Sequence, residues 1–229
     1  ISEVQYGLTL GIVFILVGLA FKISAVPFHM WAPDVYQGSP TSVTIFFAIL
    51  PKIAALSVFI RFLYVPFINL IDQWQTIIIF VSIASMVFGA VAAIGQKNLK
   101  RLMAYSSISH MGFALAGLAV GTNEGIQSSL IYISIYLLMN LAFFSCLFML
   151  KRNDIYHEDL SDLSGLSKNH PILALCLLIS LFSLAGIPPL AGFFAKFYIF
   201  LAVIKEEMYF LAIVGLLSTV VAAFYYLRV

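Results

Sequence analysis

Seven long apolar stretches are the feature of this sequence that most restricts its fold. A transmembrane helix needs about 20 predominantly apolar residues. Seven candidates cover approximately residues 6–26, 41–65, 75–95, 103–120, 126–150, 171–201 and 209–227. In lipid a helix satisfies its own backbone hydrogen bonds, so each candidate is expected to be helical. The sequence therefore predicts an all-α, polytopic transmembrane helix bundle.

The amino-acid composition agrees with a protein that lies in a lipid bilayer. The chain has 229 residues, of which 62% are hydrophobic and 10% are charged, whereas soluble domains carry about 25% charged residues. The net charge of +2 gives no reason to expect a nucleic-acid partner. Both cysteines, Cys146 and Cys176, lie in apolar runs. The sequence shows no metal-binding spacing, nucleotide-binding loop or arrangement of a catalytic nucleophile.

The charged residues between the spans predict the topology. Residues 96–102 and 151–170 hold six cations, whereas the opposite side holds only Arg61 and Lys205. Lys and Arg concentrate in cytoplasmic loops of membrane proteins. We therefore expect 96–102 and 151–170 to lie together on the cytoplasmic side.

Two of the spans contain prolines that break a helix. Pro27 follows the first span within "AVPFHMWAP", and Pro188 and Pro189 lie inside the sixth. A proline in a helix removes one N–H donor and clashes with the carbonyl four residues earlier. The carbonyls freed in this way are those of Ile23, Leu184 and Ala185. We expect both spans to be broken helices, and a simple kink is the alternative.

The order of broken and intact spans indicates a repeat of five helices: three intact, one broken and one intact. Residues 1–65 would be the end of one repeat and residues 75–229 a complete second one. The chain starts with Ile and its last apolar run reaches the final residues, so we interpret it as a single membrane domain from a longer protein. Because five is an odd number, consecutive repeats would be inverted, as in many ion-coupled transport folds.

Three lysines lie inside apolar spans, namely Lys22, Lys52 and Lys196. A lysine at the centre of a span costs at least about 2.5–3.5 kcal/mol on insertion scales. Lys22 and Lys196 could reach an interface by snorkelling, but Lys52 lies near the middle of its span. Because burial disfavours the charged ammonium, such lysines are suited to taking up and releasing protons. None of the ten acidic residues lies within a span, so we expect a carboxylate partner outside this chain.

His110 is a further candidate for proton transfer. It lies about two turns into its span, near Ser106, Ser107 and Ser109. Hydroxyl groups and glycines around it suit a hydrated path, whereas a packing role is the alternative.

Four stretches in the same order resemble a known family over essentially the whole chain. They are "FKISAVPFHMWAPDVYQGSPTSVT", "PKIAAL", "QKNLKRLMAYSSISHMGFALAGL" and "SLAGIPPLAGFFAKFYIF". Together they resemble the antiporter-like membrane subunits of bacterial proton-translocating NADH–quinone oxidoreductase (respiratory complex I). The "APDVYQGSP" stretch followed by "PK" is more similar to one of three sister subunits than to the other two. The resemblance implies a protein of about fourteen helices with two inverted five-helix repeats.

The resemblance also implies roles for individual residues. In that family one lysine precedes the first break, a second lies in the next helix, a third follows the second break, and a histidine lies on the central polar axis. Lys22, Lys52, Lys196 and His110 match these positions in that order. The family's glutamate partner of the first lysine lies on an earlier helix, outside this sequence.

The function implied is that of a non-redox subunit of a translocase. Protons would cross the membrane through the lysine/histidine relay, coupled to quinone reduction in partner subunits. The chain itself would bind no cofactor, because NADH, FMN, iron–sulfur clusters and quinone belong to those partners. Its partners would be other membrane-arm subunits and the lipid bilayer, in the bacterial inner membrane.

Two other functions remain open. One is a cation/proton antiporter subunit of the multi-subunit type, which resembles the same family, although the "APDVYQGSP" and "PK" signature argues against it. The other is a membrane scaffold that bridges neighbouring subunits without pumping.

Overall fold

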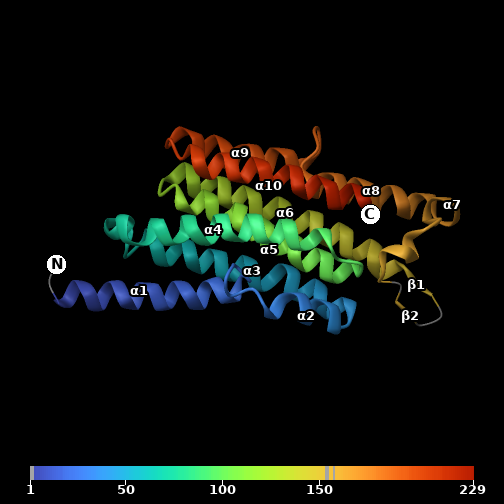
Figure 1. Cartoon of the computed structure of the whole chain (residues 1–229), viewed down its shortest axis with the longest axis horizontal. Helices are drawn as coiled ribbons and strands as arrows, with labels where there is room; N and C mark the ends of the chain where they lie inside the picture. The colour runs from blue at the N-terminus through green and yellow to red at the C-terminus, as the bar shows by residue number, and fades with distance from the viewer. Residues whose placement is uncertain (1–2, 153–154, 157) are drawn as a thin grey trace.

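The computed structural model describes residues 3–152, 155–156 and 158–229, and these form a long helical bundle (Figure 1). The α-helices are α1 Glu3–Lys22, α2 Trp31–Gly38, α3 Thr41–Tyr64, α4 Ile71–Ile94, α5 Leu99–Ala119, α6 Asn123–Met149, α7 Leu166–Asn169, α8 Pro171–Ala185, α9 Ala191–Lys205 and α10 Tyr209–Arg228. Two short 3-10 helices, Ile68–Leu70 and Leu160–Leu163, and the paired strands β1 Lys151–Arg152 and β2 Ile155–Tyr156 complete the described elements. Helices α3, α4, α5, α6 and α10 are each long and apolar enough to cross a membrane. The predicted all-α membrane bundle is confirmed.

Both predicted helix breaks are present. Helix α1 ends at Lys22 and α2 begins at Trp31, so the first break includes Pro27. Helix α8 ends at Ala185 and α9 begins at Ala191, so the second includes Pro188 and Pro189. Since several residues leave the helical conformation at each place, these are breaks rather than kinks.

Helix α5 lies in the middle of the bundle, with α1–α3 on one side of α4–α6 and α8–α10 on the other (Figure 1). Almost all of its residues, from Leu99 to Ala119, are buried. Helix α4 approaches it closely at Gly112, where an added Cβ would lie 2.8 Å from the Met86 backbone nitrogen. Small residues commonly permit such close helix packing in membranes. A polar side chain on α5 is therefore held in the protein interior rather than in lipid.

The two ends of the bundle carry different loops. We use "loop end" for the end with residues 95–98 and 158–170, and "opposite end" for the end with residues 65–70, 120–122 and 206–208. At the loop end, Asn98 and Asp159 form an isolated antiparallel bridge, and the Arg228 guanidinium donates to the Ile94 carbonyl. At the opposite end, Lys205 pairs with Glu124 at 2.7 Å. The two cation-rich loops thus lie at one end, as their alternation predicts.

Candidate functional site

His110 lies at the centre of the candidate site, on α5, with only 3% of its surface exposed. Its Nδ1 lies 2.6 Å from the Tyr132 hydroxyl of α6, and its Nε2 lies 3.0 Å from the Tyr226 hydroxyl of α10. The Tyr226 hydroxyl also hydrogen-bonds the Ser106 hydroxyl. A hydroxyl can donate or accept, so both tautomers of the neutral imidazole find suitable partners. The ring can therefore accept a proton at one nitrogen and release one from the other.

Lys52 lies on α3 and points into the protein. Only 1% of its surface is exposed, and its ammonium has no hydrogen-bond partner among the residues that the structure describes. The Nζ atom lies 5.5 Å from the centre of the Tyr36 ring and 6.0 Å from that of Tyr136. Aromatic faces attract cations at this distance. The ammonium thus faces two tyrosine rings from α2 and α6 instead of snorkelling to an interface.

Lys196 lies on α9 and reaches back across the second break. Its Nζ donates hydrogen bonds to the carbonyls of Ala185, at 2.9 Å, and Leu184, at 3.3 Å. These are the carbonyls that Pro188 and Pro189 were expected to free. The end of α8 favours a cation, because unpaired carbonyls at a helix C-terminus carry partial negative charge. The same lysine lies 5.3 Å from the Phe113 ring of α5.

Tyr136 joins the surroundings of Lys52 to those of His110. Its ring centre lies 5.1 Å from that of the imidazole. The Tyr136 hydroxyl, the Ser107 hydroxyl and the Asn140 side-chain oxygen lie close together and are buried, yet none has a well-aligned hydrogen bond within the described residues. Buried polar groups normally bind protein partners or ordered water. The space between Lys52 and His110 is therefore lined by groups that suit a water-assisted proton path.

The structure brings Lys52, His110 and Lys196 together around α5. The Tyr136 ring lies near both the Lys52 ammonium and the imidazole, and the Lys196 ammonium lies near Phe113, about one turn from His110 on α5. Lys22 differs, because its side chain is exposed at the last residue of α1. In the adjoining break, the Ser24 hydroxyl and His29 Nδ1 are buried without a hydrogen-bond partner in the described ranges. The expectation that Pro27 frees the Ile23 carbonyl stays a prediction.

Sequence reasoning missed the tyrosines around the histidine. Tyr132 and Tyr136 lie four residues apart on an apolar helix, a spacing that places them on one helical face, and this signal could have been used. Tyr226 is 116 residues from His110, so sequence spacing gives no indication of their contact.

Lys100, one of the six cations of the predicted loops, lies in the first turn of α5. It is buried, with 3% of its surface exposed, and forms an ion pair of 2.7 Å with Glu158. Its neighbours in the sequence include Lys97 and Arg101, whereas its partner Glu158 lies much further along the chain. No local pattern in the sequence indicates this pairing.

Comparison with known proteins identifies sequence relatives over almost the whole chain. The sequence family described as "NADH:quinone oxidoreductase/Mrp antiporter, TM" matches residues 2–222. NADH-quinone oxidoreductase subunit N of Pelagibacter ubique is 81% identical over 98% of this chain and 48% of that protein. The protein of the same name from Parvibaculum lavamentivorans is 59% identical over 97% of this chain and 46% of that protein. The chain thus spans about half the length of these curated relatives.

Solved structures show the same fold. A chain in respiratory complex I from Thermus thermophilus with bound Aureothin superposes with a TM-score of 0.83 and 35% identity, covering 96% of this chain and 48% of that one. A chain of the Mrp complex from Dietzia sp. superposes with a TM-score of 0.86 and 27% identity, covering 92% of this chain and 39% of that one.

Proposed function

The chain belongs to the NADH:quinone oxidoreductase/Mrp antiporter family of membrane proteins, and we propose that it is part of a proton-translocating subunit of bacterial NADH–quinone oxidoreductase. Subunit N, the name of the relatives from P. ubique and P. lavamentivorans, is the sister subunit to which the "APDVYQGSP" and "PK" signature is most similar. The protein would lie in the bacterial inner membrane among other membrane-arm subunits. The redox groups, namely NADH, FMN, iron–sulfur clusters and quinone, would belong to its partners.

The observation that carries this proposal is the buried group of Lys52, His110 and Lys196. An ionisable side chain within a span is energetically costly. Three such side chains in one region therefore favour a functional role over a packing role. The two lysines enter the interior from different helices, α3 and α9, and the Tyr132 and Tyr226 hydroxyls beside the histidine can both donate and accept. This arrangement supports proton movement between the helices.

In the proposed relay, Lys52 releases a proton into the polar space beside Tyr136. The lysine becomes a neutral amine, and the proton reaches one nitrogen of His110 while the other nitrogen releases one. Because one ring nitrogen releases a proton as the other accepts one, the histidine passes the proton on rather than storing it. Lys196 receives it in the carbonyl-lined second break. In this proposal Lys22, the lysine before the first break, also belongs to the relay. Its side chain is exposed on the surface formed by the described residues.

The proposed repeat is consistent with the direction of the broken helices. Helix α1 starts near α4 at the opposite end, where Thr9 bonds Gln73, and α2 reaches Arg101 at the loop end through Asp34. The segment α8–α9 runs the other way, from the loop end to Lys205 beside Glu124. Residues 1–65 would thus end one repeat and residues 75–229 would form the inverted second repeat. The loop end would face the cytoplasm.

The test is proton pumping by the assembled complex that contains the full-length subunit with Lys52→Met. We expect assembly on a native gel and loss of NADH-driven pumping in membrane vesicles. Unchanged pumping in both Lys52→Met and Lys196→Met would contradict the relay and favour a scaffold.

The fold shared with the Mrp complex supports the second candidate, a cation/proton antiporter subunit. Sodium-driven proton movement without NADH would favour that function.

A further inference from the structure

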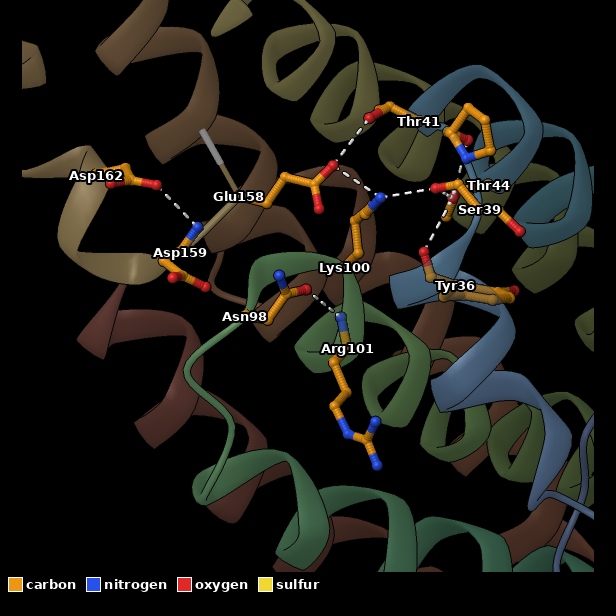
Figure 2. Close-up of polar contacts among 11 residues, drawn as sticks. Tyr36, Ser39, Thr41, Thr44, Asn98, Lys100, Arg101, Glu158, Asp159 and Asp162 are labelled. Carbon is orange, nitrogen blue, oxygen red and sulfur yellow. Dashed lines mark hydrogen bonds and ion pairs between the residues drawn. The ribbon is translucent and has the colours of Figure 1, made fainter. Parts of the chain in front are cut away.

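An ion pair between a buried lysine and a partly buried glutamate at the loop end has no place in the proposed relay. The Lys100 ammonium lies 2.7 Å from the Glu158 carboxylate, and the side chains are 3% and 20% exposed respectively. Figure 2 shows the lysine between the glutamate and the chain that joins α2 to α3. Other described ion pairs, such as Lys205–Glu124, are much more exposed. Lys100 therefore depends on its protein partners much more than a surface lysine does.

The pair connects three segments that are far apart in the sequence. Lys100 Nζ also donates to the Ser39 carbonyl at 2.7 Å, and Thr41 Oγ1 donates to the Glu158 carboxylate at 3.4 Å. Ser39 and Thr41 flank the joint between α2 and α3. The glutamate is held in turn by its backbone, because its carbonyl accepts from the Leu99 N–H at 2.7 Å. The loop before α8 is thereby fastened to the α2–α3 joint through the start of α5.

The α2–α3 joint determines where Tyr36 lies relative to Lys52. Tyr36 is in the last turn before Ser39, and its carbonyl accepts a hydrogen bond from Thr44 Oγ1 at 3.1 Å. Figure 2 shows this bond beside Ser39. The Tyr36 ring faces the Lys52 ammonium at 5.5 Å, and Lys52 lies about two turns after Thr44 on the same helix. A shift of the joint would therefore move the aromatic face away from the buried ammonium.

We propose that Lys100 and Glu158 are positioning residues for Lys52, an ionic clamp that holds the α2–α3 joint so that Tyr36 stays against the lysine. The proposal rests on the function proposed above and adds two residues to it. Removing one partner of a buried ion pair leaves an uncompensated charge. The clamp then opens, and the surroundings of residue 52 loosen even though no group of the relay has been changed.

The test measures the reactivity of a thiol at position 52. A full-length subunit otherwise free of cysteine carries Lys52→Cys in the assembled complex, and a small membrane-permeant maleimide is added. Glu158→Gln and Lys100→Met are each expected to raise the alkylation rate about tenfold, since an unpaired buried charge disrupts its surroundings. The matched control is Glu124→Gln, which breaks an exposed pair of the same 2.7 Å length at the opposite end. It should leave the rate unchanged.

Equal rates in Glu158→Gln and Glu124→Gln would overturn the clamp. If Glu158→Gln fails to assemble, Glu158→Asp replaces it, because aspartate keeps the charge on a shorter side chain. Its alkylation rate at position 52 should exceed that of the Lys52→Cys complex with Glu158 unchanged. Equal alkylation rates for these two complexes would overturn the proposal. Alkylation does not depend on proton transfer, so the clamp and the relay fail separately. With Lys52 intact, Glu158→Gln should also reduce NADH-driven pumping severalfold while the complex remains assembled.

Discussion

Lys196 and Ala185 lie on opposite sides of the second helix break, and the lysine ammonium donates a hydrogen bond of 2.9 Å to the alanine carbonyl. Lys196 thus serves two purposes in the proposed function, because it carries a proton and also closes the end of α8. Lys52 shares its burial but has no hydrogen-bond partner in the described part of the chain. Replacing each lysine should therefore affect the stability of the subunit differently.

Lys196→Leu is expected to abolish pumping and also to destabilise the subunit. The substitution leaves the Leu184 and Ala185 carbonyls without their donor, and an unsatisfied buried acceptor costs about 1–3 kcal/mol. Thermal unfolding of the assembled, detergent-solubilised complex measures the effect. An unchanged unfolding temperature would contradict the structural part of this role.

Lys52→Leu should abolish pumping without lowering stability. No hydrogen bond is lost, and an apolar side chain of similar volume removes the cost of burying an ammonium among tyrosine rings. The same thermal measurement should give an unfolding temperature equal to or above that of the unchanged complex. A marked decrease would show that the Lys52 ammonium stabilises the bundle, which favours a structural role.

Tyr226→Phe tests the contacts of His110. The substitution keeps the ring but removes the hydroxyl that lies 3.0 Å from Nε2 and also bonds Ser106. Losing such a hydrogen bond costs about 0.5–1.5 kcal/mol, so pumping should slow severalfold while the complex still assembles. Tyr209→Phe on the exposed start of α10 is the control and should pump normally. Equal rates for both variants would remove Tyr226 from the proton path.

Local sequence features predicted the spans and breaks, and the reason is physical. A run of apolar residues indicates a span without knowledge of its neighbours, and Pro188 frees a carbonyl four residues away wherever the helix lies. The sequence did not predict which group donates a hydrogen bond to that carbonyl, although it identified Lys196 as a charged residue within a span. A contact across a break depends on the relative orientation of the two half-helices, which the sequence does not show.

The surroundings of His110 show the limit of such reasoning more clearly. Its serine neighbours on α5 are visible in the sequence, whereas its hydrogen bonds go to Tyr132 and Tyr226 on other helices. Lys100 has charged neighbours in the sequence, whereas the partners that explain its burial, Ser39 and Glu158, lie far away along the chain. The four-residue spacing of Tyr132 and Tyr136 places both on one helical face, but nothing in either segment shows which helix that face packs against.

Gly186→Ala should destabilise the second break. Gly186 has φ = +88°, a conformation that favours glycine, and an added Cβ would lie 3.2 Å from Lys196 Nζ. The combined cost is about 1 kcal/mol or more, because alanine is strained where φ is positive. Gly95→Ala is the control, since Gly95 has φ = −80° and open space around its Cα. A lower unfolding temperature is expected for Gly186→Ala alone.

The final prediction concerns the orientation of the bundle. Lys97 and Lys168 lie at the loop end, and Glu206 lies at the opposite end beside Lys205. Since cytoplasmic loops concentrate Lys and Arg, single cysteines at 97 and 168 should be protected from an impermeant thiol reagent in intact cells and should react in inverted vesicles. A cysteine at 206 should show the reverse pattern, because all three positions are exposed and position 206 lies at the opposite end of the bundle. Labelling of 97 and 168 from outside intact cells would invert the orientation. The carbonyl-lined break at Lys196 would still join the two halves of its span, but the proton would then cross it from the other side.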